Sequence, residues 1–253
     1  MLKNTVQEKP LSAKDRIVLP LDFHSLGEAQ TVIEKLKNHV GLFKVGLTLY
    51  IKEGRTILEY LNSVVGPDRI FLDLKFHDIP ETVGNVSSVV VSMSPVKFLT
   101  VHASDGERIL RAAVDASQNG AKVLGITVLT SLSDAELKDL GISMTVKERV
   151  LKLARISKKA GCAGVVCSGL EALAVKEQCG KDFIVVTPGI RPKWASISAD
   201  DQRRIMTPGE AIQQGADYVV IGRPIYTSSD MVSAAIKVAA EIEEALARPS
   251  SKT

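Results

Sequence analysis

Eight short apolar runs recur along the chain, and each is followed by a stretch with helical spacing. The runs are almost continuously hydrophobic and rich in β-branched residues, as in parallel strands that are covered on both faces. They occupy residues 17–22, 42–46, 70–76, 96–103, 122–130, 164–169, 183–189 and 218–223. The stretch "SLGEAQTVIEKLKNHV" opens with a Ser cap and a Glu three positions later, and "DGERILRAAVDASQNG" ends on Gly120, typical of a C-terminal cap. This alternation predicts an α/β fold of the (β/α)₈ TIM barrel type.

An open, doubly wound parallel sheet is the alternative fold. The count of eight runs and the lack of a GxGxxG motif after the first run disfavour it. The 253 residues contain no linker rich in Pro, Gly or Ser, so the sequence predicts a single domain. We expect the barrel to span residues 15–247, between a flexible N-terminal lead (1–14) and a flexible C-terminal tail (248–253).

Composition and charge exclude several functions. A net charge of +3 is too small to indicate a nucleic-acid partner. No apolar run approaches the roughly 20 residues that cross a bilayer, and the N-terminal sequence has no apolar signal core. We therefore expect a cytoplasmic protein that does not bind membranes. The three cysteines and four histidines show no spacing typical of metal ligands, so no metal site is predicted.

Charged residues interrupt the apolar run "FLDLKFHDIP" (71–80). Burying a charge costs free energy unless the charge is paired or used. Asp73 and Lys75 are two positions apart, so a strand would present them on one face, and we expect that face to point into the barrel mouth. Asp22 closes the first run and Lys44 lies near the end of the second. Three consecutive strands would thus present two acids and two lysines to one cavity.

Asp78 follows in the loop after the third run. For any one of these charged residues, a buried network that only satisfies itself is the alternative interpretation. Their common position at the carboxyl ends of strands favours an active site, because barrel enzymes carry their active sites there.

The last two runs end in "TPGIRP" and "VVIGRPI". Loops after strands seven and eight of a barrel commonly bind phosphate through backbone N–H groups and helix N-termini. Arg223 would add a bidentate donor next to Gly222, and Arg191 and Gln202 lie in the preceding segment. An ordinary turn is the alternative for the Gly-Arg pair. Together with the charged cluster, the sequence predicts a barrel enzyme that acts on a phosphorylated small molecule.

Two connections are longer than the others. Residues 131–144 follow the fifth run and residues 190–206 follow the seventh. Both would lie at the carboxyl ends of strands, so we expect them to be candidate lids over the site.

Blocks from about residue 16 to residue 245 resemble, in order, those of the orotidine 5′-phosphate decarboxylase family. The blocks are "LPLDF", "FKVGLTLY", "LDLKFHDIPETV", "TVLTS", "VVCSG", "TPGIRP", "DDQRR" and "VVIGRPI". Related barrel enzymes that use magnesium share the DxKxxD core; one decarboxylates a keto-sugar phosphate and another condenses formaldehyde with a pentulose phosphate. The HDIP continuation and the PGIRP and DDQRR blocks favour the orotidylate branch.

The resemblance implies roles for individual residues. Lys75 would protonate C6 of the pyrimidine after carbon dioxide leaves, and Asp73 would lie beside the substrate carboxylate. Lys44 and Asp78 would complete the catalytic charge array, and Asp22 and Lys44 would bind ribose hydroxyls. The other expected substrate-binding residues are Asp73, Ile79, Thr82, Thr130, Ser131, Pro188, Arg191, Gln202, Gly222 and Arg223. The resemblance also implies a homodimer, with Asp78 and Thr82 reaching into the neighbouring subunit's site.

The implied reaction is the conversion of orotidine 5′-phosphate to UMP and carbon dioxide, the last step of de novo UMP synthesis, with no cofactor. A fixed ammonium in a dry site can stabilise a carbanion electrostatically. Flanking carboxylates would keep Lys75 protonated against desolvation. The alternatives are a magnesium-dependent sugar-phosphate decarboxylase or aldolase, and a non-catalytic nucleotide-binding paralogue, which would have no need for Lys75 between two carboxylates.

Overall fold

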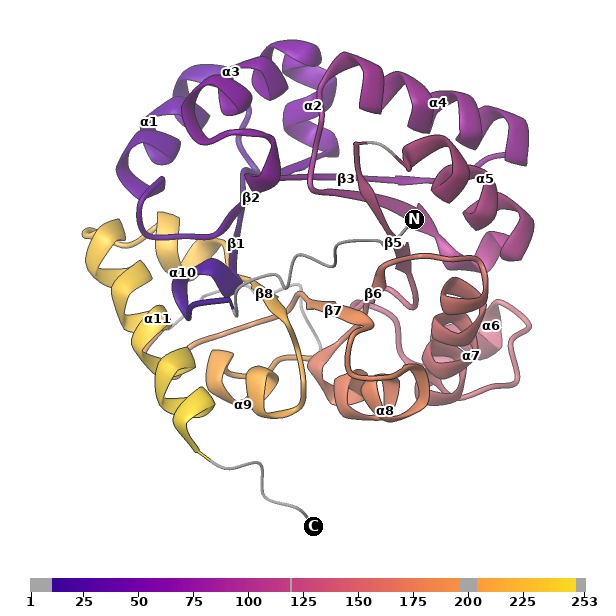
Figure 1. The fold of residues 1–253 in the computed structure, drawn as a ribbon. Helices are drawn as coiled ribbons and strands as arrows, with labels where there is room; N and C mark the ends of the chain where they lie inside the picture. The colour runs from indigo at the N-terminus through magenta and orange to yellow at the C-terminus, as the bar shows by residue number, and fades with distance from the viewer. Residues whose placement is uncertain (1–10, 119, 196–203, 249–253) are drawn as a thin grey trace, which may run out of the picture.

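The structure, a computed structural model, describes residues 11–118, 120–195 and 204–248. Eight parallel strands close into a barrel in chain order, and β8 pairs with β1 to complete it. Figure 1 shows the helices as a ring around the strands. The (β/α)₈ prediction is therefore confirmed. The strands are β1 (Ile17–Pro20), β2 (Leu42–Gly46), β3 (Ile70–Phe76), β4 (Phe98–His102), β5 (Lys122–Ile126), β6 (Gly164–Val166), β7 (Ile184–Thr187) and β8 (Tyr218–Val220). The expected flexible lead and tail fall largely outside the described residues and stay predictions.

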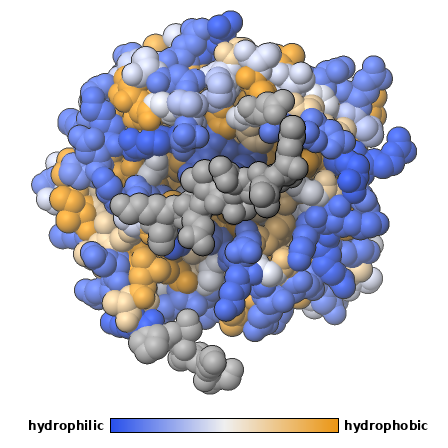
Figure 2. Space-filling view, viewed as in Figure 1, coloured by the Kyte–Doolittle hydropathy of each residue, from blue (hydrophilic) through white to orange (hydrophobic). Residues whose placement is uncertain are grey.

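Six of the eleven α-helices in the described ranges begin at a capping side chain. Ser25 accepts a hydrogen bond from the Glu28 N–H, and full capping boxes start α6, α7 and α9. The helices are α1 (Leu26–Leu36), α2 (Leu47–Glu53), α3 (Arg55–Val65), α4 (Pro80–Met93), α5 (Glu107–Ser117), α6 (Asp134–Asp139), α7 (Val146–Lys159), α8 (Gly169–Cys179), α9 (Pro208–Gln213), α10 (Arg223–Tyr226) and α11 (Met231–Ala247). Within the described ranges, none is long and apolar enough to cross a membrane. The face of the molecule in Figure 2 is largely hydrophilic, with several apolar patches between the charged residues.

A plug of side chains fills the barrel interior. Its members come from seven different strands and are almost fully buried: Val18, Leu42, Phe71, Phe98, Leu124, Val186 and Tyr218. Phe98 packs edge-on against both Phe71 and Tyr218, at ring-centroid distances of 5.8 and 5.3 Å. Leu11, which precedes β1, packs against the same plug. Among the described residues, the plug thus fills the amino-terminal part of the barrel interior, and the interior opens toward the carboxyl ends of the strands.

The two long connections differ from simple loops. Residues 131–144 contain α6, which begins at the capping box of Ser133. The connection after β7 is joined at its base, because Ile190 forms a β-bridge with Met206 and the Arg191 N–H donates to the Met206 carbonyl at 2.9 Å. This bridge fixes the points at which the segment leaves and re-enters the barrel.

Candidate active site

A cavity of about 610 Å³ lies above the plug, at the carboxyl ends of the strands. It brings together most of the residues expected from the sequence: Asp22, Lys44, Asp73, Lys75, Thr130, Ser131, Pro188, Arg191, Gly222 and Arg223. Sequence reasoning missed its mainly apolar walls: Pro20, Phe71, Ile126, Val128, Leu129, Val166, Cys167, Gly189, Val220 and Tyr226. Five of them, Pro20, Phe71, Ile126, Val166 and Val220, lie on strands, where an inward position was the available signal; the others follow strands or lie in α10. Gln202 lies outside the described residues.

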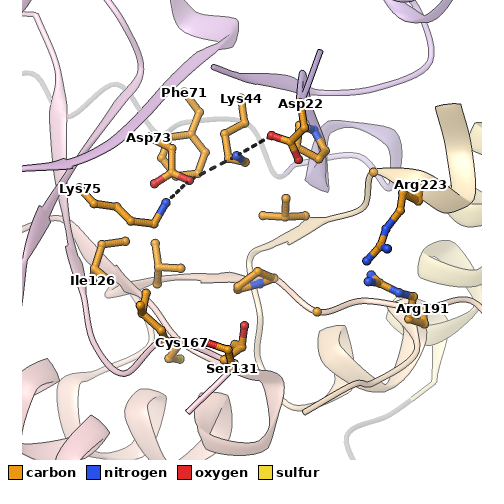
Figure 3. Close-up of a pocket in the computed structure, with 18 of the residues that line it drawn as sticks. Asp22, Lys44, Phe71, Asp73, Lys75, Ile126, Ser131, Cys167, Arg191 and Arg223 are labelled. Atoms are coloured by element: carbon orange, nitrogen blue, oxygen red, sulfur yellow. Dashed lines mark hydrogen bonds and ion pairs between the residues drawn. The ribbon is translucent and has the colours of Figure 1, made fainter. Parts of the chain in front are cut away.

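Charges of alternating sign form a line along one wall of the cavity (Figure 3). The Lys44 ammonium lies 3.6 Å from an Asp22 oxygen and 3.3 Å from Asp73 Oδ2. The same Asp73 oxygen lies 2.9 Å from the Lys75 ammonium. The Asp73 side chain is 9% exposed, whereas Lys75 is 31% exposed. The buried carboxylate therefore anchors two ammonium groups, and one of them, Lys75, faces the open cavity.

The electrostatics of the line keep Asp73 ionised. Burial raises the pKa of the Asp73 carboxyl, but the charges of Lys44 and Lys75 and two hydrogen bonds outweigh burial, so the pKa lies below its ordinary value. Asp73 Oδ2 lies 2.9 Å from the Lys75 ammonium. The geometry thus pairs an ionised, buried carboxylate with two lysine side chains of the cavity wall.

The backbone of β3 is irregular where it carries these groups. The four steps from Leu72 to Phe76 lie opposite only two steps of β4, from Leu99 to Val101, so β3 contains a bulge. Within it, Lys75 has a φ of 52° and is the only residue other than glycine with a positive φ in the described parts of the chain. Such conformations are uncommon for side chains of this size and gather at functional sites.

The opposite end of the cavity is cationic. Figure 3 shows the guanidinium groups of Arg191 and Arg223 side by side, across the cavity from Lys75. Two like charges that converge in this way favour an anion between them, and planar guanidinium groups suit phosphate. Gly222 is required here by space, since a Cβ would lie 2.8 Å from the Pro20 ring and 3.0 Å from the Tyr226 ring.

A buried ion pair holds the end of the connection after β7. The Arg204 guanidinium donates to both carboxylate oxygens of Glu171, at 2.9 and 3.0 Å, and approaches the carbonyl oxygens of Val128 and Leu129. The Glu171 and Arg204 side chains are only 6% and 12% exposed. The pair therefore ties this connection to α8 and to the loop after β5. Sequence reasoning missed it, since the partners are far apart in the chain.

Removing one partner of this pair should destabilise the fold. An Arg204→Leu variant leaves a buried carboxylate unpaired, and we expect a loss of about 3–5 kcal/mol in the free energy of unfolding. Burial raises the pKa of the Glu171 carboxyl. The charge of Arg204 lowers that pKa, but by less than burial raises it. A carboxyl with a raised folded pKa lowers stability as the pH rises through that pKa, so the loss should shrink in acid. Urea unfolding at several pH values measures it.

The double variant Glu171→Leu/Arg204→Leu is the matched test, because it removes both charges and should recover most of the loss. Arg111→Leu, which breaks a half-exposed pair with Glu107, is the control and should change stability by less than about 1 kcal/mol. A double variant no more stable than Arg204→Leu would contradict the ion-pair explanation.

Three residues expected in the site lie outside the cavity of a single chain. Asp78 and Ile79 are exposed in the loop after β3, and Thr82 is half-buried in the first turn of α4. The Asp78 carboxylate accepts the N–H of Ile79 at 2.7 Å. His77 in the same loop pairs with the buried Asp105 at 2.5 Å, which fastens the loop to the barrel. These residues contribute nothing to the cavity of their own chain.

The described residues contain no group of three or more His, Cys, Asp or Glu side chains that could hold a metal ion. All three cysteines are free and buried, and burial raises the pKa of the Cys162 thiol to about 12. Cys167 lines the cavity, but burial likewise raises its pKa. These thiols are packing groups rather than nucleophiles.

Known proteins resemble this chain over most of its length. The family described as "Orotidine 5'-phosphate decarboxylase / HUMPS family" matches residues 15–238. An orotidine 5'-phosphate decarboxylase of Desulfosudis oleivorans is 46% identical over 94% of this chain and 97% of its own. One of Heliobacterium modesticaldum is 44% identical over 94% and 100%. The crystal structure of orotidine 5'-phosphate decarboxylase from Lactobacillus acidophilus superposes with a TM-score of 0.78 at 33% identity, covering 89% of this chain and 98% of that one. The chain therefore belongs to the orotidine 5′-phosphate decarboxylase / HUMPS family.

Proposed function

We propose that this protein decarboxylates orotidine 5′-phosphate to UMP and carbon dioxide, the last step of de novo UMP synthesis. One observation carries the proposal: the cavity has a fixed ammonium beside a buried carboxylate at one end and two guanidinium groups at the other. The family description covers two groups of barrel enzymes, and the relatives at 44–46% identity carry the name of the orotidylate enzyme.

The two ends of the cavity orient the substrate. The 5′-phosphate would lie between Arg191 and Arg223, which leaves the pyrimidine toward Lys75. Asp22 would accept a hydrogen bond from a ribose hydroxyl and Lys44 would donate one, and Thr130, Ser131 and Pro188 would contact the base. The substrate carboxylate then lies beside Asp73. Repulsion between two carboxylates is relieved as carbon dioxide leaves, and this relief adds to the driving force for that step.

Lys75 supplies the chemistry in this proposal. When the C6–carboxylate bond breaks, its electron pair stays on C6. The Lys75 ammonium stabilises this charge because it is already fixed beside Asp73 before the bond breaks, and it then gives a proton from Nζ to C6. The neutral amine regains its proton from solvent. Asp73 holds the ammonium in place before each turnover.

Phosphate binding, remote from C6, can contribute to the rate. Arg191 leaves the barrel at the bridge that joins the base of the β7 connection, and Arg204 re-enters it beside Glu171. An anion held by Arg191 and Arg223 would therefore also organise this connection over the site. Gln202 would add an amide to the phosphate.

We propose further that the active unit is a homodimer in which Asp78 and Thr82 complete the neighbouring chain's site. The exposed positions of Asp78 and Ile79 support this, since a catalytic carboxylate needs a partner to act on. Apolar side chains lie exposed at the same end of the barrel: Leu47 (51%), Ile51 (80%) and Ile79 (61%). A second copy packed there would cover them.

Mixed dimers test this arrangement. Lys75→Ala and Asp78→Ala should each be nearly inactive alone. If Asp78 acts across the interface, a mixed dimer has one doubly altered site and one native site. About half of the dimers in an equimolar mixture are mixed, so the mixture should recover about a quarter of wild-type activity. The measurement is activity after unfolding and refolding the two variants together. No recovery, with mixed dimers shown by mass spectrometry, would place Asp78 in its own chain's site.

The proposal requires no metal or cofactor, and it includes a cytoplasmic location, where three unpaired cysteines are usual. It also keeps residues 15–247 as the catalytic domain. The test is formation of UMP from orotidine 5′-phosphate by metal-stripped protein. No UMP formation by protein that is shown to be folded would exclude the proposed function.

A further inference from the structure

Thr100 lies directly under the charge line, on the neighbouring strand β4, and its side chain is fully buried. Its hydroxyl makes two hydrogen bonds. The oxygen accepts the backbone N–H of Lys75 at 2.9 Å, and the O–H donates to Asp73 Oδ1 at 3.1 Å. The Thr100 hydroxyl thus contacts both the Asp73 carboxylate and the backbone of Lys75, the residue to which the chemistry is assigned.

The chemistry of the three groups fixes the direction of both bonds. A backbone N–H can only donate, and an ionised carboxylate can only accept. The single hydroxyl proton of Thr100 must therefore point at Asp73, and a lone pair must face Lys75. Asp73 then has its two oxygens assigned to different partners, Oδ1 to Thr100 and Oδ2 to the Lys44 and Lys75 ammonium groups.

Lys75 needs such a support because its backbone departs from the strand. The bulge in β3 takes residues 73–75 out of register with β4, and the positive φ of Lys75 is conformationally unfavourable. In a regular ladder a carbonyl of the neighbouring strand would accept this N–H, and here a side-chain hydroxyl does so. The hydroxyl of Thr100 therefore stabilises the one backbone conformation that aims the lysine into the cavity.

We propose that Thr100 is a positioning residue for the decarboxylation, whose hydroxyl holds the Asp73 carboxylate and the Lys75 backbone in the geometry that the reaction requires. This inference rests on the proposed function. Thr100 does not line the cavity, so it acts through Asp73 and Lys75 and not on the substrate. Small displacements of a positioned acid cost rate steeply, whereas they change ground-state binding little.

The experiment compares three variants on orotidine 5′-phosphate. Thr100→Val keeps the shape of the side chain and removes both hydrogen bonds, and we expect kcat to fall about 100-fold. The Kd of UMP, measured by calorimetry, should change less than about threefold, because UMP lacks the carboxylate. Thr100→Ser restores the hydroxyl and should recover kcat to within about fivefold of wild type.

Thr127→Val is the matched control. It removes another hydroxyl that lies in the barrel wall and donates to the Val166 carbonyl at 2.7 Å, away from the charge line. We expect near wild-type kcat for it. A wild-type kcat in Thr100→Val would overturn the inference, as would equal losses in Thr100→Val and Thr127→Val. An inactive wild-type protein would instead overturn the proposed function, so the two failures are distinguishable.

Discussion

Replacing Lys75 by alanine should lower kcat by about 10⁴-fold or more while the barrel stays folded. The variant removes both the charge that stabilises the C6 carbanion and the proton that C6 receives. The fold should tolerate the change, because Asp73 keeps the Lys44 ammonium at 3.3 Å and the hydrogen bond from Thr100. Alanine at this position has the same backbone restriction as lysine, so the bulge should persist. Steady-state turnover and thermal unfolding measure the two effects.

The matched control is Lys159→Ala. Lys159 is 74% exposed and pairs with Glu107 on the outer surface, so its loss removes the same charge far from the cavity. We expect wild-type turnover for this variant. Turnover within tenfold of wild type in Lys75→Ala would show that another group is the acid. A loss of turnover that accompanied unfolding would be tested again with Lys75→Met, which keeps the apolar stem.

Replacing Arg223 by alanine should lower kcat/KM by about 10³-fold, which corresponds to about 4 kcal/mol of transition-state stabilisation. The guanidinium lies at the end of the cavity remote from Lys75, so its effect must come through the phosphate. Part of the loss should appear in kcat, because phosphate binding also organises the connection that starts at Arg191. Initial rates over a range of substrate concentration separate the two parameters.

The phosphate-free nucleoside orotidine is the control for this prediction. Without a phosphate to hold, wild type and Arg223→Ala should decarboxylate orotidine at rates within about threefold of each other. Equal losses with both substrates would show that Arg223 supports the structure and not the phosphate. An unchanged kcat/KM for the phosphorylated substrate would remove Arg223 from the site altogether.

The barrel was predictable because hydrophobic runs and helical stretches alternate eight times along the chain. An error in the ends of one strand does not change that count. The ends of the strands were not. The fifth run was expected to reach residue 130, but β5 ends at Ile126. Val128 and Leu129 are apolar because they line the cavity, and hydrophobicity alone cannot separate a cavity wall from a strand. The break between α2 and α3 at Gly54, where φ is 56°, was also not foreseen.

The charged residues of the site were predictable from their positions at strand ends. Asp73 and Lys75 were expected to share one face of a regular strand. That expectation was incomplete, because a bulge and the positive φ of Lys75 direct its side chain into the cavity. Contacts between distant segments left no pattern to read. The hydrogen bond between Thr100 and Asp73 joins residues 27 positions apart, and the ion pair between Arg204 and Glu171 joins residues 33 positions apart. Both contacts become evident only once the barrel is closed.

The most direct test is the loss of orotidine 5′-phosphate absorbance on addition of metal-stripped protein in the presence of EDTA. We expect rapid loss with UMP as the product, because the fixed ammonium and not a metal is assigned the role of stabilising the carbanion. The contradicting result is no loss of absorbance, with magnesium restoring activity on a keto-sugar phosphate. That outcome would place the chain in the magnesium-dependent group of the same family.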